Sequence, residues 1–277
     1  MSLDIFATRG TSIVVTGADG SGKSVIAYNM ANTLVGLGYR VLLIDMDTHG
    51  RTQSYISRSN YRCIQPDSAN LMQAMRSSVG MNAYVAVPKP GFNLLTMGIG
   101  GDILELSKII QEQKLIRFVN SAKSSYNFVV YDIPFSDATT CASEISIMAD
   151  DLVLVSDSSN WGLTKTLINV FNIESDDLRE TVFSKSQLLL NRYTDVYKVM
   201  GKKVKTINDV LNSMDRKIEE IVGVDSDYKF SEIQRCLPLE YIPQFEGFWY
   251  EDKQYSDTQD GFNKFVNLIC SIVLKKN

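Results

Sequence analysis

The chain has 277 residues, of which 44% are hydrophobic and 22% are charged, a composition typical of a folded protein that can bury a substantial core. Its formal net charge of −4 disfavours DNA binding as its main task, because neutralising nucleic-acid phosphates requires a basic surface. The 4 cysteines are scattered and there is 1 histidine, which disfavours a zinc site or a disulfide framework and favours a reducing compartment inside the cell.

The sequence contains no predicted transmembrane segment at either end. Residues 1–11 lack the apolar core of a secretory signal. The apolar stretch 262–274 is interrupted by polar residues and is too short to cross a bilayer. Its apolar residues recur at helical spacing, which fits either a helix on a membrane surface or a helix packed on the protein. Because few cations accompany the stretch, we expect packing.

Short apolar runs rich in β-branched residues alternate with stretches in which apolar residues recur at helical spacing. This pattern predicts an α/β fold with a mostly parallel sheet and helices on both faces. The predicted strands are 12–16, 40–45, 128–132, 152–156 and 187–191, with a hairpin or local turn between 83–87 and 92–97. The predicted helices are 23–36, 70–77, 101–125, 139–148 and 162–172.

Residues 194–235 differ from the rest of the chain. Lysine, arginine and glutamate crowd this stretch, and an amphipathic helix is predicted around residues 206–222. We interpret the stretch as a charged helical insertion at the edge of one domain that spans residues 1–277.

The first predicted strand runs directly into the sequence GADGSGKS at residues 17–24, which matches the phosphate-binding pattern G-x-x-x-x-G-K-[ST] between a strand and a helix. Glycines let backbone N–H groups turn toward phosphate oxygens, and the following helix adds the positive end of its dipole. We therefore expect ATP with Mg²⁺, with Lys23 at the β- and γ-phosphates and the Ser24 hydroxyl on the metal. A glycine-rich turn without a ligand is the alternative. The predicted nucleotide-binding residues of the loop are Gly17, Asp19, Gly20, Ser21, Gly22, Lys23 and Ser24.

Three carboxylates follow at the predicted carboxyl ends of two strands, where open α/β sheets bind ligands. Asp45 and Asp47 are two residues apart, so an extended backbone places both on one side. Caps for the next turn are the alternative. Asp132 ends the strand 128–132 and is typical of the residue that helps to hold Mg²⁺. We predict that Ser24, Asp45 and Asp132 bind the metal.

Taken together, these motifs resemble the MinD/ParA branch of P-loop ATPases, whose phosphate loop is of the deviant Walker A type. The similarity covers roughly residues 10–195 and rests on the order and spacing of several motifs. They are the loop 17–24, VLLIDMD at 41–47, YDIP at 131–134, ADDLVLV at 149–155 and LLLNR at 188–192. The resemblance implies a P-loop fold, an ATP-dependent homodimer and ATP hydrolysis.

By this resemblance the catalytic residues are Lys23, Asp47 and Asp132. Asp47 lies in the first switch and orients water, whereas Asp132 begins the second switch. Asn191 contacts the adenine base, and the loop around Pro243 borders it. Alternatively, Asn191 only caps its strand.

One position departs from the family pattern. The family carries a lysine directly after the first glycine of the loop, and this lysine reaches across the dimer to the partner's phosphates. Here the position is Ala18. ATP binding is expected to survive, because Lys23 and the backbone remain, whereas the dimer and efficient hydrolysis are left open.

Within the branch, the nearest type is the CpaE/TadZ group, which places pilus or secretion machinery and shares the Asp-x-Pro found here at residues 132–134. This likeness implies a cytoplasmic, nucleotide-dependent spatial organiser with weak ATP hydrolysis, recruited to the inner membrane face or a cell pole by a membrane-associated protein assembly. A plasmid or chromosome partition ATPase, a non-hydrolysing scaffold and a tyrosine autokinase are the alternatives. Autokinases carry a tyrosine cluster in a disordered tail, whereas this tail has Tyr250 and Tyr255 before a helix-like stretch.

Overall fold

The computed structural model describes residues 10–47, 70–76, 81–97, 114–134, 140–173, 176–193, 197–199, 202–204, 206–222, 229–233, 235–240 and 255–274. Eight strands form the central sheet. They are β1 (Thr11–Gly17), β2 (Val41–Asp45), β3 (Ala86–Lys89), β4 (Phe92–Thr96), β5 (Phe128–Pro134), β6 (Asp151–Asp157), β7 (Ser186–Tyr193) and β10 (Arg235–Glu240).

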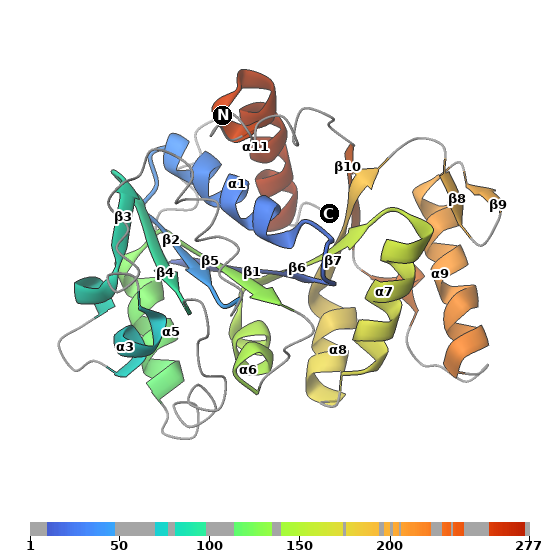
Figure 1. Cartoon of the computed structure of the whole chain (residues 1–277), viewed down its shortest axis with the longest axis horizontal. Helices are drawn as coiled ribbons and strands as arrows, with labels where there is room; N and C mark the ends of the chain where they lie inside the picture. Colours follow the sequence, from blue (N-terminus) through green and yellow to red (C-terminus); the bar gives the residue numbers. More distant parts are fainter. Residues whose placement is uncertain are drawn as a thin grey trace.

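The strand order across the sheet is β10-β7-β6-β1-β5-β2-β4-β3 (Figure 1). All neighbouring strands are parallel except β3 and β4, which form the predicted hairpin. The first strand of the sequence thus lies in the middle of the sheet, between β5 and β6. This placement puts the loop after β1 at the centre of the carboxyl edge, where ligands bind in open α/β sheets.

Helices cover both faces of the sheet, which confirms the predicted fold class. They are α1 (Lys23–Gly36), α3 (Leu71–Arg76), α5 (Lys114–Ser125), α6 (Thr140–Met148), α7 (Asn160–Phe171), α8 (Asp176–Lys185), α9 (Ile207–Val222) and α11 (Gln259–Val273). Short 3₁₀ helices are η2 (Met81–Tyr84), η3 (Phe230–Glu232) and η4 (Tyr255–Asp257).

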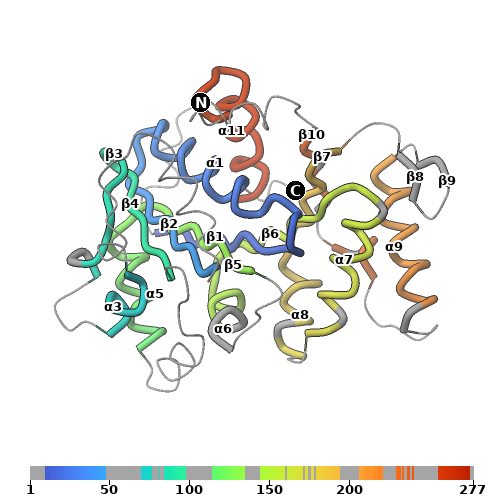
Figure 2. Tube along the Cα trace, viewed as in Figure 1, coloured from blue at the N-terminus to red at the C-terminus, as the bar shows by residue number. Residues whose placement is uncertain are grey.

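Two layers of core packing follow from the alternation of side chains along the strands. On one face, α1 and α11 pack over residues such as Val15, Leu43 and Val130. On the other face, helices including α3, α5, α6, α7 and α8 pack over residues such as Val14 and Ile44 (Figures 1 and 2). The face that α1 covers is also the face on which the candidate functional site lies.

The stretch 194–235, which we predict to be a charged helical insertion, lies at the edge of the sheet where β10 is the last strand. It links β7 to β10, which pair in parallel. The connection contains a small hairpin, β8 (Tyr197–Val199) with β9 (Lys202–Val204), and the predicted amphipathic helix α9. Lys217 of α9 donates to Thr164 Oγ1 of α7 at 2.5 Å, so the connection packs against the body of the domain. The sequence pattern does not predict β10, because proline and charged residues interrupt its apolar run.

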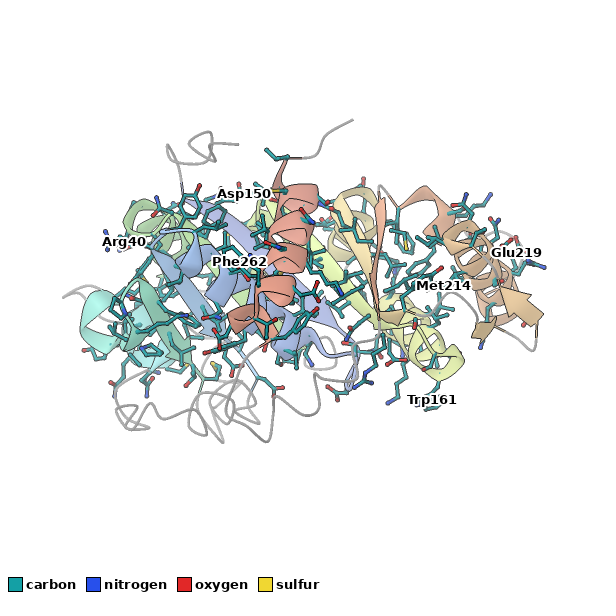
Figure 3. The ribbon with its side chains drawn as sticks, turned by 90° about the horizontal axis from the view of Figure 1, so that it is seen from above. Arg40, Asp150, Trp161, Met214, Glu219 and Phe262 are labelled. Carbon is teal, nitrogen blue, oxygen red and sulfur yellow. The ribbon has the colours of Figure 1, made fainter. Side chains whose placement is uncertain are left out.

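The apolar tail stretch forms helix α11, which packs on the protein as predicted. Its buried residues include Phe265, Leu268, Ile269 and Ile272. Figure 3 labels Phe262 on α11, and the ring of this residue lies so close to Gly36 of α1 that a Cβ there would be 2.7 Å from it. Among the residues that the structure describes, none of the helices has the length and apolarity needed to cross a membrane.

Replacing Phe265 with alanine tests this packing. Phe265 is fully buried in the core under α11, so Phe265→Ala should lower the free energy of unfolding by about 3–5 kcal/mol, because it removes a large ring from a closed core. The control is Asn267→Ala on the exposed side of the same helix, which should change that energy by less than about 0.5 kcal/mol. Urea unfolding followed by circular dichroism measures both. Equal effects of the two changes would contradict the packing of α11.

Candidate functional site: the loop between β1 and α1

The sequence GADGSGKS forms the turn that joins β1 to α1 (Figure 2). The Ser21 N–H donates to the Ala18 carbonyl oxygen at 3.1 Å and closes the turn. Gly22 precedes the helix, no side chain caps the helix there, and its first turn contains no acidic residue. Helical geometry leaves the N–H groups of a first turn without partners inside the helix, so this end of α1 is suited to an anion.

Glycine is required at Gly17 and Gly22 for steric reasons. A Cβ on Gly17 would lie 2.1 Å from the Val155 carbonyl oxygen of β6. Gly22 has a φ of 90°, in the left-handed region, and a Cβ there would lie 2.4 Å from Nδ2 of Asn191. A side chain at either position would therefore strain the loop.

Asn191, near the end of β7, contacts the loop directly. Its Nδ2 donates to the Ser21 carbonyl oxygen at 2.8 Å, and its Oδ1 accepts the Arg192 N–H at 2.9 Å. The side chain thus holds the loop against the end of β7. The contact with adenine that the resemblance implies stays a prediction, and Pro243 lies outside the described residues.

Lys23 is the cation of the site. Its side chain is 2% exposed, and its Nζ lies 3.5 Å from Oδ1 of Asp19, which is 51% exposed. Within the part of the chain that the structure describes, Nζ has no hydrogen-bond acceptor. A buried ammonium group is costly without acceptors, so Lys23 keeps N–H donors for an incoming anion.

Asp45 and Asp132 lie side by side on the face of the sheet that α1 covers. They are register partners in the neighbouring strands β2 and β5, and both are 0% exposed. Leu43 and Val130, each two residues earlier, belong to the core under α1, and strand alternation places the two carboxylates on the same face. Two buried carboxylates in this arrangement favour a bound cation or a shared proton.

Asp47 follows just beyond the end of β2 and is also buried. Its backbone N–H donates to Oδ1 of Asp45 at 2.9 Å, which is a local turn of the kind that aspartate forms with the residue two positions later. Asp45 therefore caps this turn. A carboxylate has several acceptor positions, so the same group can also bind a metal.

The donor set fits magnesium that arrives with a nucleotide. Ser24, Asp45 and Asp132 offer a hydroxyl and two carboxylates, the hard oxygen ligands that Mg²⁺ takes. Among the described residues, no three His, Cys, Asp or Glu side chains form a metal site by themselves. Mg²⁺ is usually held by one or two carboxylates, water and phosphate oxygens, so this scarcity of protein ligands is expected for a phosphate-bound metal.

Further polar residues, which the sequence patterns did not predict as part of the site, join the ends of β6 and β7 next to Asn191. Arg192 has a φ of 56° and its guanidinium pairs with Asp157 at 2.9 Å, while Ser158 Oγ donates to the Arg192 carbonyl oxygen at 2.7 Å. Burial alone would raise the pKa of the Asp157 carboxyl, but hydrogen bonds from Ser159 and Arg192 lower it below its ordinary value. The Asn-Arg pair at the end of this strand is the sequence signal for these contacts.

A family comparison fits this geometry. A sequence profile for the family described as an AAA domain matches residues 12–182, more than half of the chain. The chain belongs to this AAA-domain family. The match begins in β1 and ends in α8, so it includes the loop at 17–24 and the three aspartates, whereas Asn191 lies beyond it.

Two curated relatives are similar to this AAA-domain protein over part of their length. The candidate tyrosine-protein kinase CapB of Staphylococcus aureus is 26% identical over 147 residues, which are 53% of this chain and 61% of CapB. The signal recognition particle receptor FtsY of Mycoplasma mycoides subsp. mycoides is 27% identical over 169 residues, 59% of this chain and 42% of FtsY. The chain thus matches less than two thirds of the length of either relative.

Solved structures share the fold over nearly the whole chain. A candidate plasmid partition protein from Borrelia burgdorferi B31, bound to AMPPNP, has a TM-score of 0.63 at 18% identity and covers 96% of this chain and 100% of its own. MinD from Pyrococcus horikoshii OT3, complexed with Mg-ADP, has a TM-score of 0.60 at 16% identity, with 94% and 93% covered. These identities show the fold alone, which is the MinD/ParA-type P-loop fold.

A double-mutant cycle tests the contact between Gly22 and Asn191. Gly22→Ala should lower the free energy of unfolding by about 1–3 kcal/mol, because alanine is strained at this φ and its Cβ meets the amide. Asn191→Ala should cost about 1 kcal/mol through the lost hydrogen bond. The double variant should lose less than the sum, because removing the amide relieves the clash. Strictly additive losses in urea unfolding would show that the two residues are not in contact.

Proposed function

We propose that this AAA-domain protein binds ATP as its magnesium complex at the start of α1 and hydrolyses it slowly. The observation that carries the proposal is the placement of buried Lys23, at an uncapped helix start, on the same sheet face as the carboxylate pair Asp45 and Asp132. The Lys23 ammonium and the start of α1 suit the triphosphate, and the carboxylates of Asp45 and Asp132 suit its metal. Both groups lie at the carboxyl edge of the parallel strands, where such ligands bind in open α/β sheets.

Each residue of the site then has a role in binding or hydrolysing the nucleotide. Lys23 donates to the β- and γ-phosphates, and the backbone amides of residues 20–24 surround the phosphate oxygens. Ser24, Asp45 and Asp132 would hold Mg²⁺, which when bound neutralises charge that develops on the phosphates. Asp47, buried beyond β2, orients the attacking water. Positioning and electrostatics account for most of the rate enhancement in such a site.

The buried Ala18 is the reason for proposing slow turnover. Its side chain is 3% exposed and carries no charge, at the position where MinD/ParA proteins carry the lysine that reaches the partner's phosphates. A homodimer of this chain would therefore lack that cation. We propose that a nucleotide-dependent homodimer, if it forms, uses other contacts and turns over weakly.

We propose a cytoplasmic spatial organiser of pilus or secretion machinery that a protein partner recruits to the inner membrane face or a cell pole. The likeness of residues 132–134 to the CpaE/TadZ group supports this role. A partition ATPase is the competing role, favoured by the likeness to the Borrelia protein. The net charge of −4 favours a protein partner over DNA.

Lys23→Ala is the direct test of the nucleotide site. Removing the ammonium should weaken binding of fluorescent ATP in Mg²⁺ by at least about 30-fold, because a charge-assisted contact to phosphate is lost. Lys165→Ala on α7, which removes a lysine that lies over the Trp161 ring, should leave the affinity unchanged. The proposal would be contradicted if the unaltered protein showed no saturable binding of ATP, or if the two variants bound ATP with equal affinity. Binding without phosphate release would favour the non-hydrolysing scaffold.

A tyrosine kinase is the second candidate, favoured by the likeness to CapB. Tyr255, however, is only 4% exposed and its hydroxyl donates to Asp260 at the start of α11. We therefore expect no phosphate on Tyr255 after incubation with ATP and Mg²⁺, as measured by mass spectrometry with a phosphotyrosine immunoblot. Stoichiometric, Lys23-dependent phosphotyrosine would instead support the kinase function.

A further inference from the structure

The phosphate loop contains a charged side chain that the proposed function leaves without a task. Asp19 stands in the middle of GADGSGKS, and its Oδ1 lies 3.5 Å from Nζ of Lys23. Lys23 is almost fully buried, whereas Asp19 is half exposed. An acidic group is thus paired with the cation that is proposed to receive phosphates.

A carboxylate in this position competes with an incoming anion. A phosphate oxygen that accepts a hydrogen bond from Lys23 would lie about 3 Å from Nζ. The Asp19 carboxylate, already near the same nitrogen, would then lie within a few ångströms of the phosphate. Two like charges at that separation repel, so binding requires either loss of the Asp19–Lys23 pair or reduction of the charge on the phosphates.

We propose that Asp19 determines which form of the nucleotide the site takes: it competes with the phosphates for Lys23 and so selects the magnesium complex over the free triphosphate. This inference rests on the proposed function. The magnesium complex carries less negative charge than the free nucleotide, so Asp19 repels it less. The same pair partly neutralises buried Lys23 when no nucleotide is bound, which lowers the cost of burying the ammonium.

Asp19→Asn tests the inference, because it removes the charge and keeps the shape. The matched control is Asp176→Asn on α8, which removes the same charge from an exposed ion pair with Arg179. Binding of fluorescent ATP is measured for the unaltered protein and both variants, once in excess Mg²⁺ and once in EDTA. Circular dichroism confirms that each variant is folded, and Asp19→Ser serves as a second variant.

Asp19→Asn should tighten binding in EDTA on the order of tenfold and binding in Mg²⁺ by about two- to threefold, so the preference for the magnesium complex shrinks. Asp176→Asn should change neither affinity. If Asp19→Asn behaves like the control, or weakens binding, the inference is overturned while the proposed function stands. If the unaltered protein binds no ATP in Mg²⁺, the proposed function itself fails.

Discussion

The start of α1 is the feature on which the site depends. The chain leaves β1 at Gly17, turns through a loop of small residues and enters the helix at Lys23 without a side-chain cap. The amides of the first turn and the Lys23 ammonium both add positive potential at this end of the helix. Such an end suits an anion, which supports the proposed phosphate site.

The alternation of side chains along the strands explains how the proposed metal ligands come together. Residues of β2 and β5 alternate between the core under α1 and the core on the opposite face. Asp45 and Asp132 occupy positions that place them under α1, in register with each other. Parallel pairing of the two strands therefore brings together carboxylates that are far apart in the sequence.

Local patterns predicted much of this arrangement. The residues at 23–36 gave the observed bounds of α1, and the apolar runs gave the central strands, because buried parallel strands leave a continuous apolar signal. The contact between Asn191 and Ser21 could not be predicted from the residues alone, since it depends on the order β7-β6-β1 in the sheet. Helix α8 is largely polar, and β10 contains Pro238, so neither carried a clear periodic signal.

Backbone hydrogen exchange measured with and without ATP and Mg²⁺ tests most directly whether the start of α1 receives the phosphates. We predict saturable slowing of exchange in residues 20–25, where amides would bond to phosphate oxygens, together with slowing at residues 45–47. If ATP binds but protection appears elsewhere and residues 20–25 exchange at an unchanged rate, the nucleotide site is not at the start of α1.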